Sequence, residues 1–487
     1  MAQDEQPAGS DHGYIYNHHL VSGLTSNVAA TPPSTEEGLQ RRLAPRQLTM
    51  IAIGSAIGVG LFLGSNVTIR LAGPAVIVTY LAGAVIALIM GYALAEMSVV
   101  HPLAGSFGVF AERYLSPWSG FVVRATYGYI QALAIGAEVT AVAIYFGLWF
   151  PGVPPWLWVV TTSALLIAIN MAQVGWFGEL EYWFALIKVV AIVGFIAVGL
   201  LLVTGVGPWP ATGARNLIDA GGFFPNGWRG IWLALPLVVA SFMGVEVIAV
   251  TAGEAERPEV SIPRAMRSVV WRLIIFYIVA IGLMLMMTPW NQLASADGGL
   301  NGSPFVRAFT SVGLPYAAGI MNLVVISAAL SSANSNLYLT TRMLLSLARS
   351  GYAPRWLGGV TAKGVPLPAV AASSAGMALA IVLAVYVPQN AFLALYGTAV
   401  AGMLFVWMIV LATYLRFRKA LTDEQVEGLP IRMPWHRPTT IMAMAFIVVV
   451  LATTFFVDGL RTAVVLFLPF LAVMSLIYRR VNRVAHV

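Results

Sequence analysis

The chain contains 487 residues, of which 59% are hydrophobic and only 10% are charged, whereas a soluble domain carries about 25% charged residues. This composition excludes a soluble globular protein and indicates an integral membrane protein. There is no cysteine, which excludes disulfide and thiol chemistry. The formal net charge of +7 would suit nucleic acid, but the basic residues are distributed as in a membrane protein, so no nucleic-acid partner is expected.

The first 45 residues are polar and show no hydrophobic periodicity, which predicts a disordered cytoplasmic tail. No short apolar core with a cleavage site precedes the first apolar span, so we expect no signal peptide. His18 and His19 lie in this tail. We expect no metal site there, because no Cys, His or acidic cluster completes it.

The first apolar stretch, Met50–Pro74, is long enough to cross a bilayer but carries Gly54, Gly58, Gly60 and Gly64. Glycine costs roughly 0.8–1.0 kcal/mol in a helix interior relative to alanine, so several at one depth predict a break in the helix. The freed backbone groups must then be buried in protein or line a polar cavity, where a helix N-terminus suits a carboxylate. The alternative is close helix–helix packing through a small-xxx-small pair.

Eleven further apolar runs follow, and all are too long for the strands of a membrane barrel. The sequence therefore predicts an all-α membrane protein with 12 transmembrane helices. The runs after the first are 75–100, 117–149, 155–174, 178–204, 229–252, 266–288, 315–347, 366–387, 390–415, 438–457 and 460–478.

The Lys and Arg residues set the predicted orientation. With a cytoplasmic N-terminus, 20 of the 27 fall in cytoplasmic loops and tails, Arg272 among them, and five fall on the opposite side. Cytoplasmic loops carry the excess of Lys and Arg in membrane proteins. We therefore expect a multi-pass protein of the plasma (inner) membrane with both termini in the cytoplasm.

A second interrupted span begins the stretch Leu233–Arg264, which carries Ser241, Gly244 and Glu246 in mid-run. The two interrupted spans are the first and the sixth. An offset of five spans is odd and reverses the topology, as an inverted-repeat transporter requires. This spacing favours a binding site over simple packing at the first break.

Several long motifs occur in order along nearly the whole chain after the tail. They are LQRRLAPRQLTMIAIGSAIGVGLFLGS at 39–65, PLAGSFGVFAERYLSPWSGF at 102–121, GAEVTAVAIYFGLWFPGVPPW at 136–156, ELEYWFALIKVVAI at 179–192, SFMGVEVIAVTAGEAERPEVSIPRA at 241–265 and SAALSSANSNLYLTTRMLLSLARSGYAP at 327–354. With these motifs the chain resembles an amino acid permease of the amino acid–polyamine–organocation (APC) superfamily, in its bacterial amino acid transporter branch.

The resemblance implies a leucine-transporter-type fold with a 5+5 inverted repeat and broken helices 1 and 6. On this basis 1–45 is the tail and 46–416 is the transport core, with helices 1–10 in repeats at 46–204 and 229–416. Helices 11 and 12 and a short cytoplasmic C-terminus then occupy 417–487.

The resemblance also implies where an amino acid would bind. Its carboxylate would take backbone N–H groups around Val59 and Gly60, and its ammonium would take the carbonyls near Ala56, Ala240 and Met243. A zwitterion in a low dielectric needs donors at one end and acceptors at the other. The full set of substrate-binding candidates is Ala56, Gly58, Val59, Gly60, Ala240, Phe242, Met243 and Glu138.

Two positions depart from the family pattern. The family usually has a small hydroxyl residue where this chain has Val59, so a side-chain hydroxyl bond to the carboxylate is absent. The family usually has an aromatic residue where this chain has Ala240. An aromatic lid is then either missing or supplied by Phe242 or another span.

Lys188 is the basic residue at the centre of the fifth predicted span, with no obvious local acid. A mid-membrane lysine costs about 2.5–3.5 kcal/mol on insertion scales, which points to a function. Similar proton-coupled permeases have an amine here, with Ser331 and Ser332 of the eighth span as its partners. The alternative is a lysine that snorkels or binds one carbonyl.

Three acidic residues are the other ionisable candidates. Glu138 lies in the third span and is a functional candidate, with a structural ion pair as the alternative. We expect Glu246, after the break in the sixth span, to handle protons or contact substrate, and Glu254 to form a cytoplasmic gate. Arg124, near the inner end of the third span, is expected to anchor or pair there.

The sequence has no nucleophile elbow, HExxH motif, phosphate loop or metal cluster, so we do not expect an enzyme or a metal site. We predict a proton-coupled symporter that imports neutral L-amino acids by alternating access, with room for bulky side chains at Ala240. The proton gradient replaces any cofactor, and the partners are substrate, proton and bilayer, with the chain a monomer. An exchanger, a cationic or GABA-type carrier, a channel and a membrane nutrient receptor are the alternatives.

Overall fold

The computed structural model describes residues 50, 57–103, 105–171, 174–206, 211–254, 257–293, 303–311, 313, 315–361, 365–387, 391–457 and 460–485. The predicted tail at 1–45 and the substrate-binding candidate Ala56 lie outside the described residues.

Every regular element in the described part of the chain is a helix, which confirms an all-α protein. Eight stretches are long and apolar enough to cross a membrane, and two further apolar helices, Pro155–Asn170 and Gly227–Ser241, are shorter. The count of twelve spans and the inverted repeat remain predictions. The eight long stretches are Val59–Val100, Pro117–Gly147, Glu179–Thr204, Pro258–Met287, Tyr316–Arg349, Leu367–Tyr386, Ala394–Ala420 and His436–Thr454.

The first of these stretches contains more than one helix. It consists of α3 (Val59–Phe62), α4 (Gly64–Ala72) and α5 (Val76–Val100); Leu63 separates α3 from α4, and the 3-10 helix η1 (Gly73–Ala75) joins α4 to α5. Gly73 has a φ of 60°, and a Cβ there would lie 2.3 Å from Cγ of Pro225, so only glycine fits. At 1.5 Å per residue the stretch is about 63 Å long, roughly twice the hydrocarbon core, which is sufficient for two crossings.

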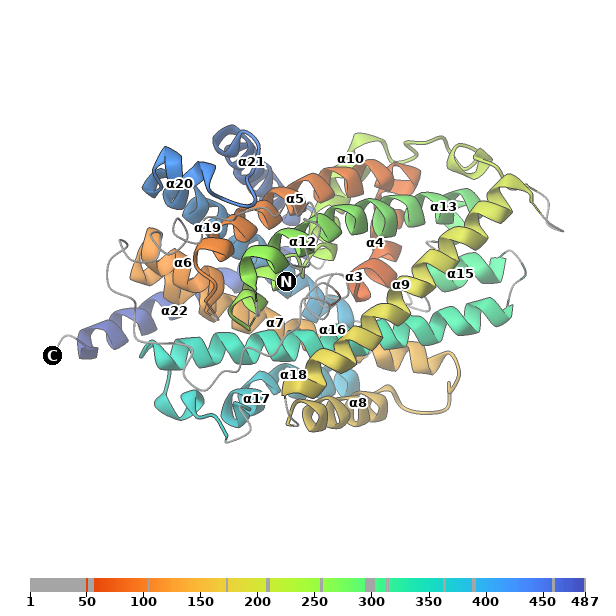
Figure 1. Cartoon of the computed structure of the whole chain (residues 1–487). Helices are drawn as coiled ribbons and strands as arrows, with labels where there is room; N and C mark the ends of the chain where they lie inside the picture. The colour runs from red at the N-terminus through yellow and green to blue at the C-terminus, as the bar shows by residue number, and fades with distance from the viewer. Residues whose placement is uncertain are drawn as a thin grey trace, which may run out of the picture.

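The centre of the bundle is α7 (Pro117–Gly147), whose apolar stretch is 78% buried. It packs against α16 (Pro315–Arg349) and α19 (Ala391–Ala420) (Figure 1). It also contacts α18 (Ala375–Tyr386) where a Cβ at Gly376 would lie 1.7 Å from the carbonyl oxygen of Ala132. Small residues allow such close backbone contact between membrane helices.

The other helices surround this centre. In Figure 1, α9 runs diagonally across the bundle and packs on α16, while α20 and α21 lie at the upper left. The remaining described helices longer than four residues are α6 (Ser106–Tyr114), α8 (Pro155–Asn170), α9 (Val174–Thr204), α10 (Gly227–Ser241), α11 (Val247–Thr251), α12 (Pro258–Arg272), the π-helix η4 (Leu273–Val279), α13 (Ala280–Met287), α15 (Pro304–Ser311), α17 (Leu367–Ser373), α20 (Asp423–Glu427), α21 (His436–Thr454) and α22 (Leu460–Ala485).

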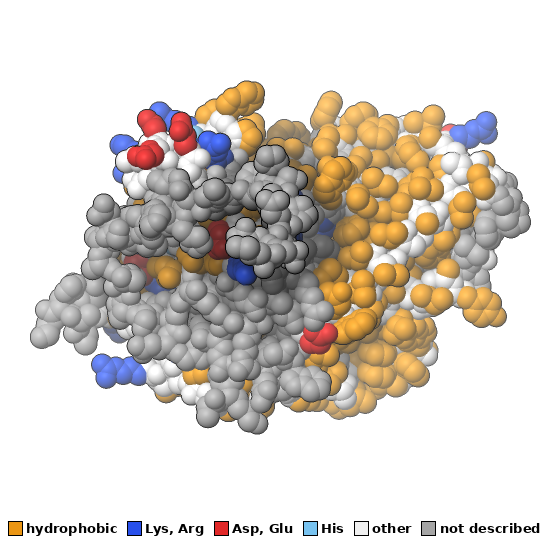
Figure 2. Space-filling model, viewed as in Figure 1, with side chains coloured by type: hydrophobic (Ala, Val, Ile, Leu, Met, Phe, Trp, Pro, Cys, Tyr) orange, Lys and Arg blue, Asp and Glu red, His pale blue; other side chains and the backbone are white. Residues whose placement is uncertain are grey.

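The outer surface fits a lipid environment. Figure 2 shows hydrophobic side chains over the side formed by α9, α10 and α13, whereas acidic side chains gather over α20. On α9, Trp183, Val190 and Val193 are each at least half exposed, at 54%, 62% and 50%. Large apolar side chains exposed over a wide area mark a membrane-facing surface.

The structure shows an interruption in the sixth predicted span and the start of a helix in the first, where residues 51–56 lie outside the described residues. The helix α10 ends at Ser241, a turn follows through residues 242–246, and α11 begins at Val247. Gly244 has a φ of 103°, a conformation that L side chains rarely adopt. In the first span α3 begins after Gly58, whose backbone is extended.

Candidate functional site

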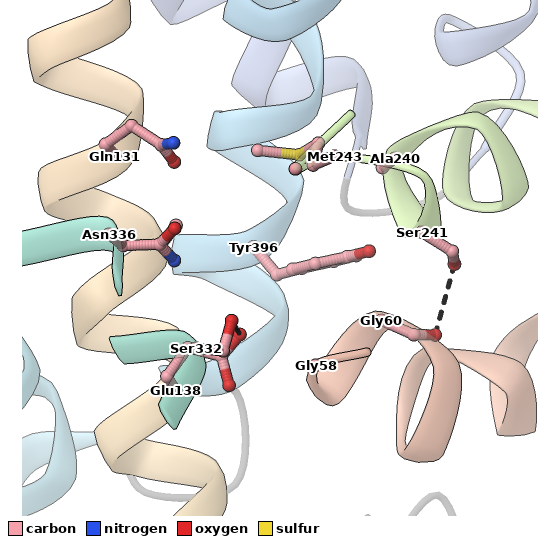
Figure 3. Close-up of a pocket in the computed structure, with 12 residues that line it drawn as sticks. Gly58, Gly60, Gln131, Glu138, Ala240, Ser241, Met243, Ser332, Asn336 and Tyr396 are labelled. Atoms are coloured by element: carbon pink, nitrogen blue, oxygen red, sulfur yellow. Dashed lines mark hydrogen bonds between the residues drawn. The ribbon is translucent and has the colours of Figure 1, made fainter. Parts of the chain in front are cut away.

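A small cavity lies between the start of α3 and the turn after α10 (Figure 3). Five of the predicted substrate-binding residues line it, and Val59 and Phe242 do not. The lining residues are Gly58, Gly60, Gln131, Ala134, Glu138, Ala240, Ser241, Met243, Gly244, Ser332, Asn336 and Tyr396.

Two glycines allow α3 to approach its neighbours at this cavity. A Cβ at Gly58 would lie 2.8 Å from Oγ of Ser332 and 3.0 Å from Oε1 of Glu138. A Cβ at Gly60 would lie 2.7 Å from the hydroxyl of Tyr396 and 3.0 Å from Cα of Ser241. The Ser241 hydroxyl donates to the Gly60 carbonyl at 3.1 Å and so joins the two interrupted segments.

The carboxylate of Glu138 lies at the start of α3. It accepts a 2.7 Å hydrogen bond from the Ser332 hydroxyl at Oε1, and the Val59 backbone amide also faces it. Backbone N–H groups at the start of a helix lack helical partners and attract anions. The Glu138 carboxylate therefore lies beside the amides that the resemblance assigns to the substrate carboxylate.

The aromatic ring at the cavity comes from α19 and not from Phe242. The Phe242 ring is fully buried and packs against Tyr277 and Tyr80, with ring centroids 4.6 and 6.0 Å apart. Tyr396 points its ring into the cavity (Figure 3). Its hydroxyl has no hydrogen-bond partner among the described residues. Of the sources left open for an aromatic lid, another span is the one that this geometry fits.

Glu246 holds the turn between α10 and α11. Its Oε2 accepts from the Gly244 backbone N–H at 3.0 Å, and its Oε1 accepts from the Tyr127 hydroxyl at 3.2 Å. The side-chain amide of Gln131 in turn donates to Tyr127 at 2.7 Å. Because Gln131 lines the cavity, this chain of hydrogen bonds connects Glu246 to the cavity without placing its carboxylate in it.

Lys188 has an acidic neighbour that the sequence analysis missed. Glu181 precedes it on α9 by seven residues, about two helical turns, and both side chains are fully buried. Oε1 of Glu181 accepts a 2.5 Å hydrogen bond from the Ser331 hydroxyl. Lys188 lies within electrostatic range of Glu181 and Glu138. The expectation of no local acid was therefore wrong, because two-turn spacing places both residues on one helix face.

Ser331 and Ser332 connect the two carboxylates through α16. Each adjacent hydroxyl donates to a different acid, Ser331 to Glu181 on α9 and Ser332 to Glu138 on α7. Both serines were predicted as partners of Lys188. Their hydrogen bonds to acidic side chains make them members of one buried polar cluster with Lys188.

The loop count placed Arg272 in a cytoplasmic loop, and the structure shows that this is wrong. Arg272 is the last residue of α12 and only 2% exposed. Its guanidinium nitrogens have no hydrogen-bond partner within the described chain, although Glu246 lies within electrostatic range. The loop interpretation failed because the apolar run that starts at 266 extends through it.

The remaining candidates are structural or undescribed. Arg124 pairs with Glu112 and donates to Ser346 and Ser350 at 3.1 and 2.9 Å, which confirms the pairing predicted for it. The side chain of Glu254 lies outside the described residues. In the described part of the chain, no group of three or more His, Asp or Glu side chains is placed to hold a metal ion.

Helix ends, a cavity and buried ionisable groups within an apolar helical bundle are features of membrane carriers for small polar molecules. The family model for amino acid permeases matches residues 47–487. The chain therefore belongs to the amino acid permease family.

Curated relatives from Bacillus subtilis (strain 168) match over most of their length. The uncharacterized amino acid permease YtnA is 40% identical, covering 88% of this chain and 92% of the relative. The probable threonine/serine transporter YbxG is 38% identical over 90% and 94% of the two chains. The gamma-aminobutyric acid permease is 39% identical over 89% and 91%.

Proposed function

We propose that this permease is a proton-coupled symporter that imports neutral L-amino acids across the plasma membrane by alternating access. The observation that carries the proposal is the position of the Glu138 carboxylate, beside the helix start that would receive the substrate carboxylate. The chain acts as a monomer, with both termini in the cytoplasm. Arg342, which is buried within α16, leaves the loop count together with Arg272, so 18 basic residues remain on the cytoplasmic side against five, which preserves the bias.

The two helix interruptions supply opposite partial charges to a zwitterion. The start of α3 offers the backbone amides of Val59 and Gly60 to the carboxylate. The end of α10 offers carbonyls near Ala240 and Met243 to the ammonium, with Ala56 as a further candidate. Each helix end carries roughly half an elementary charge of the required sign, so the pose requires no charged side chain.

Coupling follows from competition at the start of α3. An ionised Glu138 and a substrate carboxylate would repel each other at the same amides in a low dielectric. Substrate therefore binds with Glu138 neutral, and the proton enters with the substrate. Lys188 acts on Glu138 electrostatically and takes part in coupling through its positive charge.

The lining residues favour a neutral substrate. Apart from Glu138, the side chains at the cavity are uncharged, so a neutral Glu138 leaves no anion for a basic side chain. If Glu138 stayed ionised, it would instead bind an ammonium, which is the observation that favours a cationic or GABA-type carrier as the second candidate. Ala240 lines the same cavity as Tyr396, and we expect its small side chain to admit a bulky substrate side chain.

The proposal is tested with purified protein in proteoliposomes. An imposed inward proton gradient should drive accumulation of a neutral radiolabelled amino acid, and replacing sodium with potassium should have no effect. All amino acids are then compared as competitors. Counterflow without proton-driven accumulation would instead indicate an exchanger, and absence of counterflow would indicate a channel or receptor.

A further inference from the structure

Glu181 is a buried carboxylate to which the proposed function gives no role. It lies on α9 with an exposed fraction of 0%, as does Lys188 two turns later. Its Oε1 accepts the Ser331 hydrogen bond and its Oε2 has no hydrogen-bond partner among the described residues. An ionisable side chain in a membrane-spanning segment is costly and marks a functional site by default.

The charges around Lys188 do not balance when every group is ionised. Glu181 on its own helix, Glu138 on α7 and Arg272 on α12 act on Lys188 electrostatically, and α16 contributes hydroxyl and amide side chains around Glu181. Arg272 has Glu246 as its acidic neighbour, so these two charges cancel. Lys188 then faces two carboxylates, and the cluster carries one excess negative charge.

One proton neutralises this excess. A buried cluster with an unbalanced charge is strongly penalised, and groups that interact closely take up protons as a unit. With Glu181 present, the cluster of Glu138, Lys188 and Glu181 binds one proton. Without the Glu181 charge, Lys188 and Glu138 form a neutral ion pair that needs no proton.

We propose that Glu181 is a proton-coupling residue of this permease, a fixed counter-ion of Lys188 whose charge makes Glu138 the group that takes up the proton. This inference rests on the proposed proton symport. It assigns Glu181 a charge role that is separate from anchoring α9 to α16, because the hydrogen bond from Ser331 needs only an acceptor oxygen.

The test is Glu181→Gln, which retains an acceptor oxygen for Ser331 and removes the charge. Glu179→Gln, on the same helix at a half-buried position, is the matched control. A one-unit pH gradient supports up to about tenfold accumulation by a one-proton symporter. We expect Glu181→Gln to lose this accumulation and to bind substrate more weakly, because Glu138 then stays ionised beside Lys188, and Glu179→Gln to retain both accumulation and affinity.

A charge rescue separates coupling from folding. The double variant Lys188→Met/Glu181→Gln again has one excess negative charge, on Glu138, and should regain pH-dependent substrate binding that Glu181→Gln lacks. Glu181→Asp keeps the charge and should retain coupling. The inference would be overturned if Glu181→Gln and Glu179→Gln showed equal proton-driven accumulation. It would also be overturned if Glu181→Gln lost counterflow and the double variant did not regain pH-dependent substrate binding.

The same assay distinguishes the two proposals. If the unsubstituted protein shows counterflow but does not respond to a proton gradient, the proposed symport fails and the Glu181 inference fails with it. If the unsubstituted protein is driven by protons and Glu181→Gln is driven equally, only the role of Glu181 is rejected.

Discussion

Glu138 is the residue at which substrate and proton meet in this account. Its carboxylate accepts from Ser332 and lies against the start of α3, where a Cβ on Gly58 would come within 3.0 Å of it. The geometry leaves little room for a second anion beside an ionised Glu138. The same residue therefore controls both affinity and coupling.

Replacing Glu138 by Gln should make substrate binding independent of pH. In the unsubstituted protein, binding takes up a proton, so affinity should rise as pH falls, by up to tenfold per pH unit. Glutamine keeps an acceptor for Ser332 and carries no charge. Titrating substrate into purified protein across the acid and alkaline range measures this slope, with the exposed Glu427→Gln as control. A Glu138→Gln protein with the unsubstituted slope would exclude Glu138 as the proton site.

Ala240 is the residue that we expect to limit the size of the substrate side chain. An Ala240→Phe substitution would add a ring to the cavity lining, and overpacking a fitted site costs about 1–3 kcal/mol. Bulky substrates should lose affinity by roughly 5- to 150-fold, since 1.4 kcal/mol is tenfold, whereas glycine and alanine should lose little. Inhibition constants for alanine, leucine and phenylalanine measure the difference, and an equal loss for all three would show that no spare volume exists.

The helix interruptions are the elements that create the site. Glycines predicted them, because few other residues break a helix inside a membrane. Glu181 and Lys188 are seven residues apart on α9, about two helical turns, and this spacing alone predicts that they share one helix face. The contacts of Tyr396 and Ser331 with residues of other helices were not predictable, because periodicity gives the face of a helix and not its neighbour. The π-helix η4 also has no glycine or proline to reveal it.

Gly244 tests the interruption between α10 and α11. Its φ of 103° strains any L residue, so Gly244→Ala should lower the free energy of unfolding by about 1–3 kcal/mol and weaken substrate binding. The control is Gly282→Ala in α13, where a Cβ meets only Ile77 at 3.9 Å and should stabilise slightly. Thermal denaturation in detergent compares them, and equal melting temperatures for the two variants would show that the turn does not depend on Gly244.

At the scale of the whole molecule, composition predicted the membrane class and order of motifs predicted the family. The helix boundaries were predicted less accurately. The stretch Pro258–Met287 starts eight residues before the predicted run at 266–288, because a polar helical segment precedes its apolar part. Position along the chain also misassigned Arg272, since a run of apolar residues does not tell which of its charges are buried.

The N-terminal tail is predicted to be dispensable for transport. The family match begins at residue 47, and residues 1–38 are polar without periodicity. Deleting residues 2–38 should leave the transport rate and affinity within about twofold, a difference of ~0.4 kcal/mol. Initial uptake rates, normalised to the amount of inserted protein, measure this. Loss of transport with normal insertion would show that the tail regulates the carrier.

The most direct measurement of proton symport is the proton flux that accompanies substrate entry. Proteoliposomes that contain a pH-sensitive dye, with no imposed gradient, receive the preferred amino acid outside, and dye and radiolabel are followed together. The account predicts internal acidification in step with uptake, about one proton per amino acid for the single excess charge of the cluster. Amino acid uptake without acidification would contradict it.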